Sequence, residues 1–310
     1  MNRPIVLRLI LSGLLLAAVS GPAVAQLNED LLGLSDENLK GYLDPLQVGL
    51  SGTLNSAVFR SGFVPQTGFE FTVGVAAMAV GFSSGDRTYR PVDPEGFTSL
   101  EPTDVPTVVG DPAGVIVLGE GGLARGYPGG FDLEGFEIAV PQASLGCVLG
   151  TRVLVRYIAL NLGDADLGEF KYLGIGGQHS ISQWIPSLSV DLAVGAFYQD
   201  FKISDDLLHV QSMQLNLTGS RQIGILQPYV GVGYDTLTLD AHAEDEDHPE
   251  DAIDVNLDRK SNMHFTLGLM ARLSILGIFG EYNAGAGAGF ALGFDLGTIG
   301  GANHANRDAS

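Results

Sequence analysis

Cysteine is almost absent from this sequence, which has Cys147 alone among its 310 residues. A single cysteine excludes an internal disulfide and a cluster of thiolate ligands for a metal. We therefore interpret Cys147 as a small packed side chain rather than as a reactive thiol.

Positive charge is also scarce. The chain has 16 Lys and Arg against 36 Asp and Glu, which gives a formal net charge of -20. Binding to nucleic acid needs clusters of Lys and Arg that neutralise phosphates, and no basic patch is present. The composition argues against nucleic acid as a partner.

Long apolar runs are missing after the N-terminus. The run FTVGVAAMAVGF at residues 71–82 is shorter than the about 20 residues that a membrane-spanning helix needs, and the run LGLMARLSILGIFG is interrupted by Arg272. Any later membrane span must therefore be built from strands.

The first 25 residues have the pattern of a secretory signal. Arg3 and Arg8 precede and enter an apolar stretch, which ends on the small-x-small site Ala23, Val24, Ala25. We predict cleavage after Ala25 and export from the cytoplasm. The chain also combines 43 Gly and a positive mean hydropathy with its acidic charge, which is unusual for a soluble globular protein.

Several segments of about ten residues alternate apolar with polar or small side chains. In residues 188–199, Leu192, Val194 and Tyr198 share one face, whereas Asp191 and Gln199 lie on the other. The same alternation covers residues 69–79, 152–159 and 264–273, and it directs Arg152, Arg156 and Arg272 away from lipid.

A soluble β-sandwich alternates too, but the signal and the glycine-rich strands favour a membrane barrel. An open sheet edge in lipid would leave backbone groups unpaired, so the sheet must close. We predict an all-β transmembrane antiparallel barrel of about 10–14 strands at residues 49–300, in which the last strand closes against the first. The expected strands are 50–62, 68–82, 136–146, 150–162, 169–182, 187–202, 207–221, 224–239, 261–275 and 277–297.

The segments outside these strands have other patterns. Residues 26–48 have helical spacing with Ser35 as a cap, and we expect them at the periplasmic mouth or in the lumen. Residues 301–310 form a tail. Aromatic residues near segment ends suit interfacial girdles: Tyr157, Tyr172, Trp184, Tyr198, Tyr229, Tyr234 and Tyr282.

Two long loops are predicted, at about 83–135 and 240–259. The first is rich in Pro and Gly, and it either caps the pore, folds inward or contains a strand pair. The second concentrates acidic residues at 241–258, whose oxygens could bind calcium. It lacks the glycine turn and the spacing of a dedicated calcium loop, so we favour a solvated loop.

Four blocks resemble an uncharacterised family of Gram-negative outer-membrane barrels: YLDPLQVGLSGTLNSAVFRSG, TDVPTVVG, GTRVLVRYI and GIGGQHSISQWIP. The layout is more distantly similar to the long-chain fatty-acid transporter barrels. That resemblance implies passage of hydrophobic compounds, an N-terminal hatch at residues 26–48 and a lateral opening in the wall. The chain is shorter than those transporters, and no ligand-binding residue matches.

We therefore predict an outer-membrane protein that is inserted by the barrel-assembly machinery and contacts outer-membrane lipids. One hypothesis is a passage for a hydrophobic small molecule. The alternative is a structural or surface-interaction barrel without a pore. A continuous apolar cavity near the hatch would favour the first hypothesis, whereas a lumen packed with charges would favour the second. Such charges would be Arg152, Arg156 and Arg272 with Glu70, Asp191 and Glu281.

A lipid-modifying enzyme is a further alternative, suggested by Gln178, His179, Ser180 and Ser182. Adjacent strand residues point to opposite faces, so His179 and Ser180 do not pair directly. The chain has no Gly-x-Ser-x-Gly elbow, phosphate loop or His-Glu-x-x-His motif. We predict no catalytic, cofactor-binding or metal-binding residue and no cofactor.

Overall fold

The computed structural model describes residues 33–66, 68–161, 169–185, 188–203, 207–243 and 253–298. The predicted signal peptide, the tail and the centre of the acidic loop lie outside these ranges. None of the helices in the described ranges is long and apolar enough to cross a membrane.

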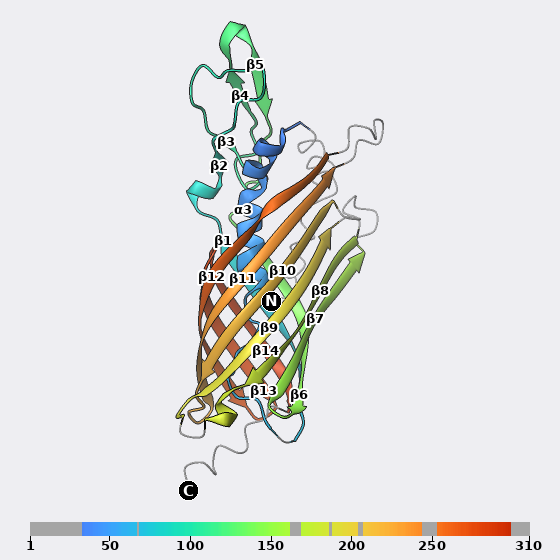
Figure 1. The fold of residues 1–310 in the computed structure, drawn as a ribbon, viewed down its shortest axis with the longest axis vertical. Coiled ribbons are helices and arrows are strands. Elements are labelled where there is room, and N and C mark those ends of the chain that lie inside the picture. The colour runs from blue at the N-terminus through green and yellow to red at the C-terminus, as the bar shows by residue number, and fades with distance from the viewer. Residues whose placement is uncertain are drawn as a thin grey trace, which may run out of the picture.

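Ten antiparallel strands close into a barrel in the order β1-β14-β13-β12-β11-β10-β9-β8-β7-β6, as Figure 1 shows. The strands are β1 (Glu70–Gly81), β6 (Gly135–Val148), β7 (Thr151–Asn161), β8 (Glu169–Ser180), β9 (Asp191–Ile203), β10 (Leu208–Ser220), β11 (Leu226–Ala243), β12 (Ile253–Leu273), β13 (Leu276–Ala284) and β14 (Ala288–Thr298). The pairing of β1 with β14 closes the barrel, from Phe71↔Thr298 to Val80↔Gly289. The predicted fold class and the closure of the last strand against the first are confirmed.

Two of the predicted strands were wrong, and their errors cancel in the count. Residues 50–62 are not a strand, because helix α3 (Asp36–Leu54) continues to Leu54 and an irregular segment follows it. Residues 277–297 are two strands, β13 and β14, joined by a turn at 285–287. The turn lies within the sequence AGAGAG at residues 284–289, which was predicted to belong to a single strand.

The barrel exterior is apolar, as the alternation predicted. Leu192, Val194 and Leu267 point outward, whereas Asp191 and Gln199 are buried in the lumen. Five of the predicted girdle aromatics are at least 40% exposed on the outer face: Tyr157, Trp184, Tyr198, Tyr234 and Tyr282. The prediction was wrong for Tyr172 and Tyr229, which do not lie at the outer face. Both are fully buried inside the barrel, where their hydroxyls bond to Gln199 and Glu281.

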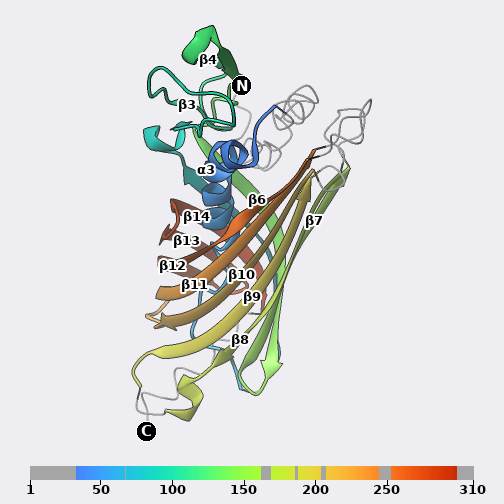
Figure 2. The same ribbon diagram turned by 45° about the horizontal axis from the view of Figure 1, so that its top comes forward.

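The two ends of the barrel differ. At one, called the turn end here, strands are joined by tight turns such as Leu149–Gly150, where both residues have positive φ (51° and 75°). At the other, the loop end, residues 82–134 form a separate unit, called the cap, beyond the wall (Figure 2). The cap contains the strand pairs β2 (Thr88–Tyr89) with β3 (Val105–Pro106) and β4 (Val115–Leu118) with β5 (Ala124–Tyr127).

Candidate functional site: a plugged lumen

Helix α3 lies inside the barrel and enters it from the loop end (Figures 1 and 2). Leu39, Leu43 and Leu50 are at most 1% exposed. They belong to one apolar core with lumen-facing residues of the wall, which include Tyr172, Phe201, Val210, Leu237 and Leu239. The loop-end half of the lumen is therefore filled by hydrophobic packing, with α3 at its centre.

The start of α3 agrees with the predicted cap at Ser35. Ser35 is the N-cap residue, its carbonyl oxygen accepts from Leu39 N (2.8 Å), and its hydroxyl accepts from the Asn38 amide (3.0 Å). Helix α3 continues to Leu54, beyond the predicted boundary at residue 48, and residues 26–32 of the predicted hatch lie outside the described residues.

Side-chain hydrogen bonds accompany the end of α3, in the region where a strand was predicted. The hydroxyl of Thr53 donates to Gly49 O (2.9 Å), the amide of Asn55 to Ser51 O (3.1 Å) and the hydroxyl of Ser56 to Gly52 O (2.6 Å). These short polar side chains bond to the carbonyls of the preceding turn, which satisfies the helix end.

Residues 55–66 continue from α3 through the lumen toward the turn end, and we call residues 36–66 the plug. Asn55 accepts through Oδ1 from Gln199 Nε2 (3.1 Å) and Ser212 Oγ (3.1 Å), and through its carbonyl from Gln214 Nε2 (2.7 Å). Further on, Gly62 N donates to Ser220 Oγ (2.9 Å). The plug is thus held by polar side chains of several strands.

Glu281 on β13 fixes a strained point of the plug. Its carboxylate accepts from the backbone N–H of Ala57 (2.6 Å), the hydroxyl of Tyr229 (2.7 Å) and the amide of Asn283 (2.8 Å). Ala57 has φ +56°, in the left-handed region that a residue with a Cβ rarely adopts. A charged acceptor at this N–H compensates part of the strain.

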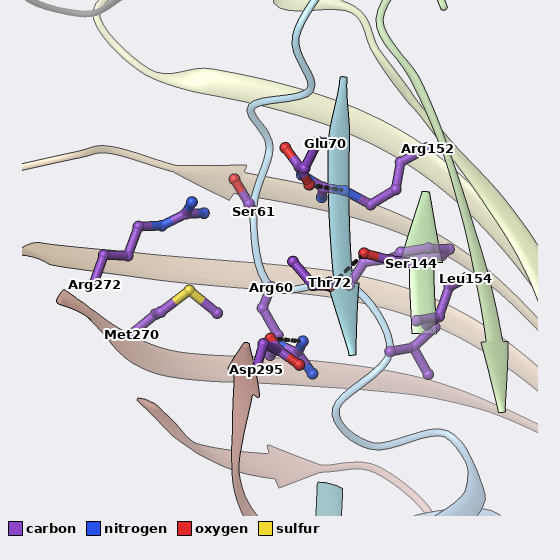
Figure 3. Close-up of a pocket in the computed structure, with 12 residues that line it drawn as sticks. Arg60, Ser61, Glu70, Thr72, Ser144, Arg152, Leu154, Met270, Arg272 and Asp295 are labelled. Carbon is purple, nitrogen blue, oxygen red and sulfur yellow. Dashed lines mark hydrogen bonds and ion pairs between the residues drawn. The ribbon is translucent and has the colours of Figure 1, made fainter. Parts of the chain in front are cut away.

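Ion pairs close the turn-end half of the lumen. Arg152 pairs with Glu70 (2.6 Å) and also donates to Phe63 O in the plug (3.1 Å). Arg60 of the plug pairs with Asp295 on β14. Figure 3 shows both pairs beside the remaining space between plug and wall.

The predicted lumenal charges are all inside the barrel. Some of them bond to the backbone of the plug instead of forming salt bridges with one another. Arg152 and Glu70 form a direct pair. Arg156 instead bonds to plug carbonyls, and Glu281 bonds to a plug N–H. Arg60 was missed because residues 50–62 were assigned to the wall rather than to the lumen, and its pairing with Asp295 was missed with it.

Two small cavities lie beside the plug among the described residues. The cavity between Arg60, Arg152 and Arg272, here called the arginine cavity, has a volume of about 40 Å³. A second cavity, beside the C-terminal turn of α3, has about 10 Å³. Sites for drug-sized ligands usually have about 300–1,000 Å³.

The cap holds the plug from outside. Asn38 exchanges two hydrogen bonds with the backbone of Val92 (2.9 and 2.8 Å). The hydroxyl of Tyr42 donates to Gly129 O (2.9 Å), and Val108 N donates to Tyr42 O (3.0 Å). Movement of α3 out of the barrel would break these bonds.

His179 and Ser180, which suggested a lipid-modifying enzyme, lie on opposite faces of the wall, as predicted. His179 lies on the outer face, bonded to Thr151 Oγ1 (2.9 Å) and Gln183 Nε2 (2.8 Å), and it stacks on Trp184. Ser180 is buried on the lumenal face beside Ser182 (3.2 Å). Both ring nitrogens of His179 therefore have partners, and its ring lies on the opposite face of the wall from Ser180.

A buried pair of His264 and Asp235 (2.7 Å) lies beside the second cavity, and no sequence motif predicted it. Within the described ranges, no group of three or more His, Cys, Asp or Glu side chains could hold a metal ion. Residues 244–252 of the acidic loop lie outside those ranges, and the solvated loop stays a prediction.

Comparison with known proteins places this chain in a family. Residues 3–298 match the model of a family of unknown function, DUF6588, and the chain belongs to that family. No curated protein matches it.

Solved structures give weak likenesses. A loop L8 deletion mutant of OmpT, an outer membrane protein of Vibrio cholerae, has 10% identity and a TM-score of 0.27, with 74% of this chain and 99% of that chain covered. A mutant porin of Rh. blastica has 11% identity and a TM-score of 0.17, with 74% and 99% covered. These scores are too low to bear on function. The predicted likeness to fatty-acid transporter barrels has no counterpart among these structures and stays a prediction.

Proposed function

We propose that this protein resides in the outer membrane. The support is the closed barrel with apolar side chains around its outer face, together with the predicted signal peptide. Outer-membrane lipids would then cover the wall, and the barrel-assembly machinery would insert it. Fractionation of cells and heat-modifiable gel mobility of the envelope extract test this, and a soluble periplasmic product would contradict it.

Within that membrane, the protein acts as a closed barrel with a structural or surface-interaction role. The observation that carries this proposal is the plug, which occupies the lumen along its length and is bonded to the wall through Arg156, Glu281 and Arg152. The arginine cavity beside the plug, about 40 Å³, has room for only a few waters.

The cap supplies the surface for such a role. Leu100, Ile116, Leu118 and Leu123 are each at least 50% exposed, and Leu100 N bonds to Leu118 O (2.9 Å), which brings their backbones together. Adjacent exposed apolar side chains are typical of interaction sites. Ile116 and Leu118 lie on β4, which projects beyond the barrel in Figure 1.

Ion conductance in planar bilayers tests the closed state. The full mature chain should show no steady conductance, whereas a variant with residues 36–63 deleted should conduct once its refolding is verified by gel mobility. The Ile116→Ser variant, which leaves the lumen intact, serves as the matched control and should stay silent. Steady conductance of the unaltered chain would overturn the closed-barrel proposal.

Passage of a hydrophobic small molecule is the second candidate, and the apolar loop-end half of the lumen favours it. If α3 moved outward, the wall residues that now contact Leu43 and Leu50 would line an apolar chamber. Binding of a labelled long-chain fatty acid distinguishes the two. Saturable binding that changes when residues 26–48 are deleted would support passage, and its absence would favour the closed barrel.

A further inference from the structure

The arginine cavity has an imbalance of charge. The described side chains around it include three guanidinium groups, of Arg60, Arg152 and Arg272, but two carboxylates, of Glu70 and Asp295. Asp191, another carboxylate of this half of the lumen, does not line the cavity. The cavity therefore has one positive charge more than its own carboxylates neutralise.

Arg272 is the unmatched group. Glu70 pairs with Arg152, and Asp295 pairs with Arg60. Arg272 donates through Nε to the neutral amide of Gln227 (2.7 Å), and its terminal nitrogens have no hydrogen-bond partner within the described part of the chain. Figure 3 shows its guanidinium directed into the cavity with no dashed line to a carboxylate.

An unmatched guanidinium in a barrel lumen is costly, because charges away from bulk water are usually paired or bonded. The field is reinforced by Arg60, whose Nε is buried and has no partner among the described residues. The other hydroxyls at the cavity are already engaged, since Thr72 bonds to Ser144 (2.7 Å) and Ser61 to Gln227 (2.7 Å).

We propose that the arginine cavity is a binding site for a small inorganic anion of the size of a halide, held by the terminal nitrogens of Arg272. The volume of about 40 Å³ is room for about three water molecules, so a monatomic anion fits together with a water. This small volume favours a monatomic anion over a larger organic one. The bound anion neutralises the third arginine and stabilises the packing of the plug against β12.

The test compares the thermal transition of the full mature chain, refolded in detergent, in sodium chloride and in sodium gluconate at equal concentration. A ligand that binds only the folded state raises its midpoint, and the rise saturates with concentration. Chloride should raise the midpoint of heat-modifiable mobility by about 2–4 °C over gluconate. Arg272→Gln should abolish this difference.

Arg221→Gln is the matched control, because Arg221 is an exposed arginine at the same end of the barrel. General salt effects act on all three proteins alike, so the control should keep the chloride effect. Equal midpoints of the unaltered chain in the two salts, or a chloride effect that persists in Arg272→Gln, would overturn the proposal.

A crystal of the unaltered chain grown in bromide gives an answer that does not depend on the folding of a variant. Anomalous density within hydrogen-bonding distance of Arg272 supports the site, and water alone at that position refutes it. The anion site needs the barrel fold but not the closed-barrel role, so its failure leaves the conductance result unaffected.

Discussion

The guanidinium of Arg156 on β7 donates to the carbonyl oxygen of Leu54, the last residue of α3 (3.3 Å). It also donates to Ser56 O (2.9 Å) and Gln142 Oε1 (3.3 Å), and its exposed fraction is 0%. A cation at the C-terminus of a helix binds its free carbonyls and opposes the negative end of its dipole. Arg156 therefore connects the wall to the plug where the helix ends.

Replacement of Arg156 by Met should destabilise the barrel. Met keeps much of the volume but leaves the carbonyls of Leu54 and Ser56 buried without that donor, at about 1–3 kcal/mol each. The midpoint of heat-modifiable mobility should fall by several degrees. Arg221→Met, at an exposed position, should leave it unchanged. An unaltered midpoint in Arg156→Met would contradict the role given to this residue.

Glu281→Gln should loosen the plug without changing side-chain size. The carboxylate accepts hydrogen bonds from Ala57 N, Tyr229 Oη and Asn283 Nδ2. In the amide of Gln, one of the two oxygens is replaced by an NH₂ group, which cannot accept these hydrogen bonds. We expect transient conductance events in planar bilayers that the unaltered chain lacks. Glu137→Gln, on an exposed position of β6, is the control and should remain silent.

Gly62→Ala tests the position of the plug directly. A Cβ on Gly62 would lie 2.1 Å from the carbonyl oxygen of Asp191, and backbone cannot move aside as a flexible side chain does. Refolding yield should fall, or residues 55–66 should become sensitive to protease. Gly126→Ala in the cap, where a Cβ meets nothing within 4 Å, should behave as the unaltered chain.

We predict that the cap loses stability at high pH because of Tyr89. Burial raises the pKa of its hydroxyl above the ordinary value of 10.0, and that hydroxyl has no partner among the described residues. The folded state resists loss of this proton, so the stabilisation is present below pH 10 and is lost as the pH rises further. Protease cleavage within residues 82–134 should increase above about pH 10, and Tyr89→Phe should shift this onset upward. The same onset in both proteins would exclude Tyr89 as the cause.

Much of the barrel wall could be predicted from the sequence because lipid outside and polar groups inside impose a period of two on every strand. Eight strands were predicted near their observed places, and the alternation directed Arg152 and Arg272 correctly. The first strand was wrong because residues 50–62 belong to α3 and to the irregular segment of the plug. Its polar side chains bond to the wall rather than to solvent, and that difference depends on tertiary contacts.

The site itself was only partly predictable. Sequence alone indicated charges in the lumen but not their partners, because Arg60 and Asp295 are separated by most of the chain. Tyr172 and Tyr229 were expected at the membrane interface, since Tyr suits both places. Their burial follows from the strand register, which sets them on the lumenal face with Gln199 and Glu281.

The position of α3 ahead of β1 in the chain has a consequence for how the molecule is made. The barrel closes through pairs such as Phe71↔Thr298, whose members are far apart in sequence, and contacts of this kind form slowly. The helix is synthesised before every strand, yet it ends up enclosed by all of them. Enclosure of the helix therefore depends on a seam that forms only after the last strand has been made.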